Sequence, residues 1–216
     1  MTSPTVPSSG SDRGFRVLHT LRCIGVVGED RLAIASGLEP AEAASALRDL
    51  ARRGLVSHDP GPFGGWSMTD TGRSTGLRWV TEELVASGTA HDVENAYQLF
   101  LRLNPLVLDV CRDWQMQIVA GAPVLNDHTD VEHDAGVIDR LMRLDGEAQR
   151  LLDPLAGDLP RFGVYKTRLA SALRRVMAGD NGYLTDEVES YHAVWFQLHE
   201  DFLVTLGLSR EGGAVQ

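Results

Sequence analysis

The stretch that decides the predicted fold is LRDLARRGLVSHDPGPFGGWSMTDTGR, residues 47–73. A helix is expected to close on Arg52-Arg53-Gly54, because glycine commonly ends a helix. A short strand follows over residues 55–59, and a returning strand over 66–69 puts alternate side chains on one face. Between them, residues 60–65 carry two prolines and three glycines, which is typical of a tight turn. The order helix, hairpin and capped helix is the most specific local pattern in the chain.

The residues before this stretch predict three helices, over 14–27, 29–36 and 39–53, with a turn at Gly37-Leu38. Apolar residues recur in them at helical spacing. The sequence therefore predicts a mainly α protein with an N-terminal winged helix-turn-helix and a small two-stranded wing over 14–86. An all-helical C-terminal domain is expected over 90–208. Residues 1–13, which are rich in Ser, Thr and Pro, and residues 209–216 are expected to form tails, the first one disordered.

Two runs in the N-terminal part, LRDLARRGLV at 47–56 and WSMTDTGR at 66–73, resemble the winged-helix domain of MarR-like transcriptional regulators. The resemblance covers about residues 14–86 and implies a DNA-binding regulator. The segments YKTRLASALRRVMAGD at 165–180 and SYHAVWFQLHEDFLVTLG at 190–207 resemble helical regulator-type domains of actinobacterial proteins. That second resemblance implies no defined activity.

The predicted helix after the turn is the candidate DNA-reading element. With Ala43, Leu47 and Leu50 turned inward, its outward face offers Ser45 and Arg48 to base edges, and Arg52 or Arg53 to phosphate. The charge balance does not favour DNA binding, because residues 13–85 hold nine arginines and nine acidic residues. Strong nonspecific DNA binding needs an excess of basic side chains. The wing tip also holds no Arg or Lys. A winged-helix module that binds another protein, and not DNA, is the alternative interpretation.

The last predicted helix, which Thr185 should cap, has the clearest amphipathic pattern in the chain. Aromatic residues and two histidines on it predict an effector pocket in the C-terminal domain, lined by Trp114, Tyr191, His192, Trp195 and His199. The competing interpretation is a packed core in which each of these side chains is satisfied by its neighbours. The many apolar helical faces of this domain also predict a homodimer, and two-fold symmetry suits palindromic DNA sites.

No enzyme motif is found: the chain has no Gly-rich phosphate loop, no Gly-x-Ser-x-Gly and no Cys-x-x-Cys. No catalytic residue, cofactor or metal is therefore predicted, and an enzyme or metal-binding domain that uses the C-terminal histidines is a distant alternative. A charged group at 128–134 (His128, Asp130, Glu132, His133 and Asp134) is interpreted as a solvated helix start. Cys23 and Cys111 are expected to be buried free thiols. No apolar run is long enough to span a membrane, so a cytoplasmic location is expected.

Overall fold

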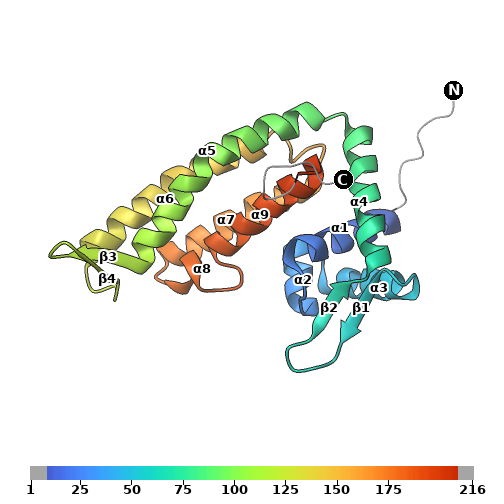
Figure 1. Ribbon diagram of the computed structural model, residues 1–216, viewed down its shortest axis with the longest axis horizontal. Coiled ribbons are helices and arrows are strands. Elements are labelled where there is room, and N and C mark those ends of the chain that lie inside the picture. Colours follow the sequence, from blue (N-terminus) through green and yellow to red (C-terminus); the bar gives the residue numbers. More distant parts are fainter. Residues whose placement is uncertain (1–8, 209–216) are drawn as a thin grey trace. The chain divides into compact units, whose positions relative to one another are not determined.

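The computed structural model describes residues 9–208, with side chains from residue 12 onward, and it is mainly helical with two small antiparallel sheets (Figure 1). Its described part divides into two compact units, one made of 9–88 with 203–208 and the other of 89–202. The predicted tail at 209–216 and residues 1–8 of the predicted N-terminal tail lie outside the described residues. None of the helices in the described range is long and apolar enough to cross a membrane.

Within residues 9–88, the first unit contains four helices and one two-stranded sheet. Its elements are α1 (Ser9–Ile24), α2 (Glu29–Ser36), α3 (Pro40–Arg52), β1 (Val56–Asp59), β2 (Gly65–Met68) and α4 (Asp70–Ser87). Residues 9–13, predicted to be tail, thus belong to α1. The core is a cluster of aliphatic side chains from every element except α4, against which Trp79 of α4 packs. Val27, predicted to end the first helix, instead exchanges backbone hydrogen bonds with Trp66 of β2, at 3.1 and 2.8 Å.

Two local devices fix the course of this chain segment. Gly37 ends α2 in the left-handed conformation, and its amide bonds to carbonyls of the last turn. Thr69 caps α4: its hydroxyl accepts from the amide of Gly72 at 3.0 Å and donates to the carbonyl of Gly54 at 2.7 Å. A Cβ at Gly72 would lie 1.9 Å from the carbonyl oxygen of Leu55, so only glycine fits there. The short hairpin is thereby locked against the start of α4.

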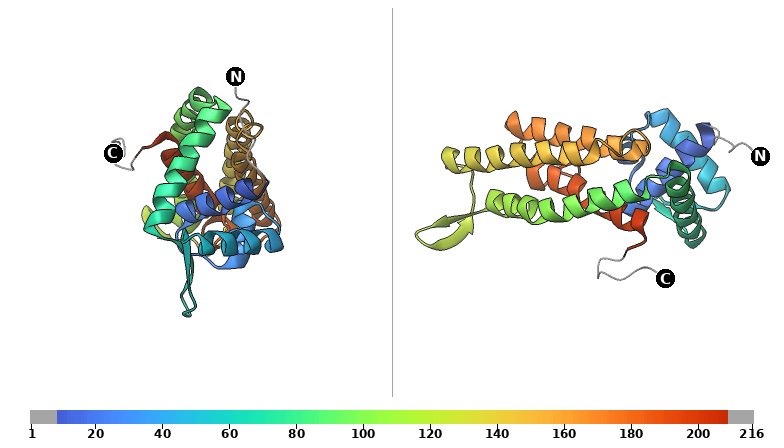
Figure 2. Two further views of the ribbon diagram at one scale, coloured as in Figure 1. Left: turned by 90° about the vertical axis from the view of Figure 1, so that its right-hand side faces the viewer. Right: turned by 90° about the horizontal axis from the view of Figure 1, so that it is seen from above.

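The second unit is a helical bundle with a small hairpin at one end (Figure 2). Its elements are α5 (Ala90–Gln115), β3 (Met116–Val119), β4 (Ala122–Leu125), α6 (Val131–Leu152), α7 (Pro160–Met177), α8 (Gly182–Thr185) and α9 (Tyr191–Leu206), of which residues up to 202 belong to this unit. Helix α5 packs on α6, and α6 on α7. Aromatic side chains of α9 fill the interior: Trp195 stacks on Phe100 of α5 at 4.5 Å, and Phe202 lies 5.2 Å from Phe162 of α7.

The prediction of an all-helical C-terminal domain is wrong at residues 116–125, which form the β3–β4 hairpin. Ala120 and Gly121 both have positive φ, 51° and 82°, and together make the two-residue turn that suits a hairpin. This turn is not one of the Asn-Gly or Asp-Gly pairs that announce a hairpin. Pro123 within β4 also gave the stretch the composition of a loop.

The predicted last helix is also divided. Residues 182–185 form the separate short helix α8, and the expected first residues of the long helix, 186–190, are a turn in which the amides of Asp186 and Glu187 both bond to the carbonyl of Gly182 at 2.8 Å. Helix α9 begins only after Ser190, whose hydroxyl accepts from the amide of Ala193 at 3.2 Å. Thr185 therefore does not cap the long helix.

Candidate functional site

The exposed face of α3 carries the residues predicted to contact DNA. Ala43, Leu47 and Leu50 are almost completely buried on its inner face, whereas Ser45, Arg48 and Arg52 are exposed. This division follows from the helical repeat, because residues three and four apart share a face. The sequence pattern assigned these side chains to the correct sides of the helix.

Both acidic residues within α3 are compensated by arginine. Glu42 forms an ion pair with Arg13 of α1 at 2.7 Å, and Asp49 pairs with Arg52 one turn along α3. Among the described residues, Arg48 forms no ion pair. The exposed face therefore has one arginine whose charge is not offset by a neighbouring carboxylate, although α3 as a whole is close to neutral.

Arg53, the fourth predicted DNA-contacting residue, lies at the C-terminal end of α3. Its guanidinium carbon is 5.1 Å from the centre of the Trp79 ring on α4. A cation at this distance is attracted to the face of an indole and keeps its full charge. Trp79 thus restrains Arg53 beside the exposed face of α3 while the side chain stays accessible.

The β1–β2 hairpin ends in a closely constrained tip that presents an aromatic side chain. Asp59 accepts a hydrogen bond from the amide of Gly61 at 2.9 Å, and a Cβ at Gly64 would lie 2.1 Å from the Asp59 carbonyl oxygen. Phe63 is 97% exposed at this tip, and His58 contacts Trp66 across the sheet. The hairpin therefore offers an apolar contact where basic residues are absent from the sequence.

The structure does not bring together all five residues predicted to line an effector pocket in the bundle. Tyr191, Trp195 and His199 lie on α9 against α5: the Trp195 indole donates to Asn104 at 2.9 Å, and His199 lies 5.0 Å from the ring of Phe100. Trp114, at the end of α5, instead contacts the ring of His128. His192 is half-buried on α9. Trp114, Tyr191 and Trp195 are 2% exposed or less, so their rings are packed inside the bundle.

A buried carboxyl group lies beside Tyr191. The Tyr191 hydroxyl donates to Oδ1 of Asp145 at 3.3 Å, and the Gln149 amide donates to the same oxygen at 3.2 Å. Burial raises the pKa of Asp145, and these two hydrogen bonds offset only part of that effect. Burial also raises the pKa of Tyr191 well above its ordinary value, with the Asp145 charge adding to it. Ionisation of the buried Asp145 carboxyl group therefore lowers the stability of the folded bundle.

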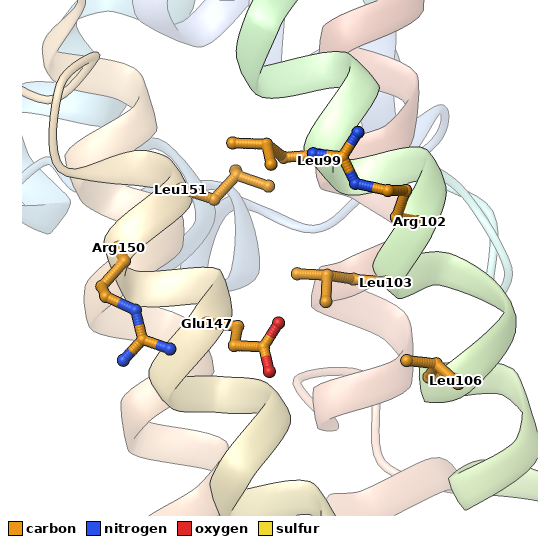
Figure 3. Close-up of a pocket in the computed structure, with 7 residues that line it drawn as sticks. All are labelled: Leu99, Arg102, Leu103, Leu106, Glu147, Arg150 and Leu151. Atoms are coloured by element: carbon orange, nitrogen blue, oxygen red, sulfur yellow. The ribbon is translucent and has the colours of Figure 1, made fainter.

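A groove that the sequence analysis missed lies between α5 and α6 (Figure 3). It has a volume of about 380 Å³ and is lined by leucines and three charged residues: Leu99, Arg102, Leu103, Leu106, Glu147, Arg150 and Leu151. Figure 3 shows Glu147 pointing toward α5 and Arg150 pointing away from it. The signal in the sequence was the pair of exposed leucines seven positions apart, Leu99 and Leu106, which is hard to separate from an ordinary core pattern.

The charged cluster predicted to be a solvated helix start is one in part: exposed Asp130 caps α6 by accepting from the His133 amide at 3.0 Å, whereas His128 and Asp134 belong to an ordered network at the base of β4. The Asn126 amide donates to the Trp114 carbonyl at 2.9 Å and to Asp134 at 2.8 Å, and its oxygen accepts from the His128 amide at 3.1 Å. His128 Nδ1 lies 2.9 Å from Asp134, and its backbone has a positive φ of 61°. Asn126 is only 9% exposed. This network ties the β3–β4 hairpin to the end of α5.

Further ion pairs hold the same end of the bundle. Burial acts to raise the pKa of Asp113, but hydrogen bonds from Arg140 and Arg112 outweigh it and hold the pKa below its usual value. The Arg140 guanidinium lies 2.8 Å from the Asp113 carboxylate, and His133 Nε2 lies 2.7 Å from the Asp113 carbonyl oxygen. Helix α6 is thereby fastened to α5 next to the hairpin.

Comparison with known proteins identifies no relative: no family model, curated protein or solved structure matches the chain.

Proposed function

We propose that the protein is a DNA-binding transcriptional regulator in which residues 9–88 act as a winged helix-turn-helix. In this proposal α3 enters the major groove and the β1–β2 hairpin is the wing. The observation that carries the proposal is the exposed face of α3: it follows a tight glycine turn, its two acidic residues are paired with arginines, and Arg48 has no acidic partner among the described residues. Such a face is what major-groove recognition requires of a helix.

Each candidate residue has a role that fits its chemistry. Arg48 has the two parallel donors that match O6 and N7 of guanine, and Ser45 can donate to or accept from a base edge. Arg52, once released from Asp49, and Arg53, restrained on Trp79, meet phosphate oxygens and set the register. Phe63 at the wing tip supplies an apolar contact of the kind that proteins insert into the minor groove.

The bundle is the proposed regulatory part, for dimerisation or for sensing a small molecule. The groove between α5 and α6 is a more accessible position for an effector than the residues predicted from sequence, because its leucines line open space. Trp114, Tyr191 and Trp195 are buried against neighbours and favour a structural role.

The test is DNA binding by a double variant, Arg48→Ala with Arg52→Ala. The matched control is Arg143→Ala with Arg174→Ala, which removes the same charge from two exposed arginines of the bundle. The probe is a duplex from the protein's own upstream region, titrated at several salt concentrations beside a random duplex. Because Arg52 is assigned to phosphate and Arg48 to a base edge, the salt slope of the α3 variant should fall by about one, and its preference for the upstream duplex over the random duplex should weaken. Equal affinity and equal slope for wild type and α3 variant would place DNA contact elsewhere or nowhere.

A second candidate, a winged-helix module that binds a protein partner, is favoured by one observation. Phe63 is 97% exposed, on a hairpin tip without Lys or Arg. If the wild type binds neither duplex at low salt, this candidate becomes the better one, since electrostatic attraction to DNA is strongest under that condition.

A further inference from the structure

The groove between α5 and α6 has an apolar floor and an open side. Leu103 of α5 and Leu151 of α6 form the floor, and their exposed fractions are only 7% and 4%. Leu99 and Leu106, about one turn of α5 to either side of Leu103, are 41% and 49% exposed. The volume of about 380 Å³ lies within the range of about 300–1,000 Å³ that is usual for small-molecule sites. The groove therefore has the size and the lining of a site for a small ligand.

Three charged side chains border this apolar surface: Arg102 on α5, and Glu147 and Arg150 on α6. All three are exposed. In the described part of the chain, none of them forms an ion pair or a side-chain hydrogen bond. Other arginines of the bundle, such as Arg140 and Arg168, are paired with carboxylates. The groove thus carries charges of both signs that the described side chains do not neutralise.

The directions of the side chains explain why Glu147 pairs with neither arginine. Glu147 and Arg150 are three positions apart on α6, but Figure 3 shows Glu147 pointing toward α5 and Arg150 pointing away from it. Side chains also lean toward the N-terminus of their own helix, and α5 and α6 run in opposite directions (Figure 1). Arg102 therefore extends along α5 toward Leu99, as Figure 3 shows, whereas Glu147 leans the opposite way along the groove. The positive and negative ends are displaced from each other.

This displacement sets the length of a ligand that satisfies both charges. Leu151 lies across the groove from Leu99 in Figure 3, and Glu147 is four positions, or about 6 Å, before Leu151 on α6. Because Arg102 extends toward Leu99, its guanidinium group is about one helical turn from the Glu147 carboxylate. An extended peptide spans about 3.5 Å per residue, so two residues match this separation and one residue is too short.

We propose that the groove binds an apolar dipeptide with free termini. Its ammonium group lies at Glu147, and its carboxylate lies at Arg102, whose guanidinium group offers two parallel donors to a carboxylate. Its two side chains cover the apolar floor of Leu103 and Leu151. The peptide bond faces the open side of the groove, where water satisfies its donor and acceptor.

Charge distinguishes this ligand from apolar molecules with a single charged end. An apolar carboxylate leaves Glu147 without a partner at the edge of the floor, and an apolar amine leaves Arg102 without one. A dipeptide with both termini free has no net charge, so the chain's formal charge of −10 does not repel it. This inference rests on the sensing role proposed for the bundle. Its tests use no DNA, so their failure is distinguishable from a failure of the proposed DNA binding.

The first test is isothermal titration calorimetry of the full chain at low salt with leucyl-leucine, with its C-terminal amide and with its N-acetyl form. Wild type should bind either blocked peptide about two- to fivefold more weakly than the free peptide, as expected for the loss of an exposed ion pair. Arg102→Gln should bind leucyl-leucine and its amide equally, and Glu147→Gln should bind leucyl-leucine and its N-acetyl form equally. The controls Arg174→Gln and Glu132→Gln, which change exposed side chains outside the groove, should keep both preferences.

The second test fills the groove. Leu106→Trp places a larger side chain at one end of it, and Leu108→Trp is the matched control, because Leu108 is 45% exposed on α5 but does not line the groove. Leu106→Trp should bind leucyl-leucine several-fold more weakly with an unchanged circular dichroism spectrum, and Leu108→Trp should bind it as wild type does.

Four results would each overturn the proposal. They are no binding of leucyl-leucine to wild type at millimolar concentration, equal affinity for free and blocked peptides, wild-type affinity in Leu106→Trp, and binding of octanoate as tight as that of leucyl-leucine. The last result would show that the site needs no ammonium group at Glu147.

Discussion

The substitution Asn126→Asp tests whether the network at the base of the hairpin is as important as its geometry indicates. Asp and Asn have the same shape, so the change leaves no cavity. The variant keeps the oxygen that accepts from the His128 amide but loses the NH2 group that donates to the Trp114 carbonyl and to Asp134. It also sets a second carboxylate against Asp134 at a position that is only 9% exposed.

The expected cost follows from these lost contacts. Two hydrogen bonds contribute about 1 kcal/mol each to net stability, and each acceptor left unsatisfied in a buried position costs about 1–3 kcal/mol. Because only the bond to the Trp114 carbonyl is buried, whereas Asp134 is part-buried and keeps its contact with His128, we expect a total of about 3–5 kcal/mol, with the like-charge contact included. With a urea dependence of about 2 kcal/mol per molar, the midpoint of unfolding of the bundle should fall by about 2 M.

The assay is urea unfolding followed by circular dichroism, together with amide hydrogen exchange read out on peptides from the hairpin. Asn95→Asp, an exposed change of the same kind on α5, is the control for added charge. Faster exchange over residues 115–126 should accompany the loss of stability. A midpoint equal to that of Asn95→Asp, with unchanged exchange in the hairpin, would refute the assignment of Asn126 as the anchor.

Three further outcomes are expected. Because burial raises the pKa of Asp145, the charged form of this carboxyl group disfavours folding. Asp145→Asn should therefore raise the melting temperature at neutral pH, and this gain should shrink as the pH falls through the carboxyl range. The exposed control Asp139→Asn should show neither effect. Gly72→Ala should destabilise the first unit by about 2–4 kcal/mol in thermal unfolding, since its Cβ would meet the Leu55 carbonyl; an unchanged melting temperature would contradict this contact. Burial raises the pKa of Cys111 to about 12, so iodoacetamide in mildly alkaline buffer should modify it only after denaturation, as peptide mass spectrometry would report.

Short-range sequence signals in the first unit were sufficient to predict its elements, apart from the two ends of α1. The helix over 29–36 and the end of α3 were set by Gly37 and Gly54, both in the left-handed conformation that glycine adopts most easily. The hairpin at 56–68 was also predicted correctly, and Thr69 supplies the cap expected at the start of the following helix. Signals of this kind act over a few residues, so they can be recognised in a single sequence.

Elements of the second unit depended on contacts far apart in the chain and were predicted less well. Helix α5 runs unbroken through Pro105, a residue that usually kinks or ends a helix, and the residues on both sides of it, Leu103 and Val107, are buried on the same face. The network of Asn126, His128 and Asp134 could not be foreseen, since its main acceptor is the backbone carbonyl of Trp114. Likewise, the groove between α5 and α6 depends on how two helices separate, which no local pattern encodes.

The packing of α9 on α5 has a consequence for how the protein is made. Trp195 donates to Asn104, 91 positions earlier in the chain, and its ring covers Phe100. A ribosome adds about 5–20 residues per second, so α5 is outside the ribosome for roughly 5–20 s before its partner helix is synthesised. During that interval the part of α5 that packs on α9, including Phe100, is exposed in the nascent chain. The first unit, whose core lies within residues 17–79, can fold in the same period. Chaperones that bind nascent apolar segments should therefore be retained on α5 until α9 emerges, and ribosome profiling of chaperone-bound chains would locate that release.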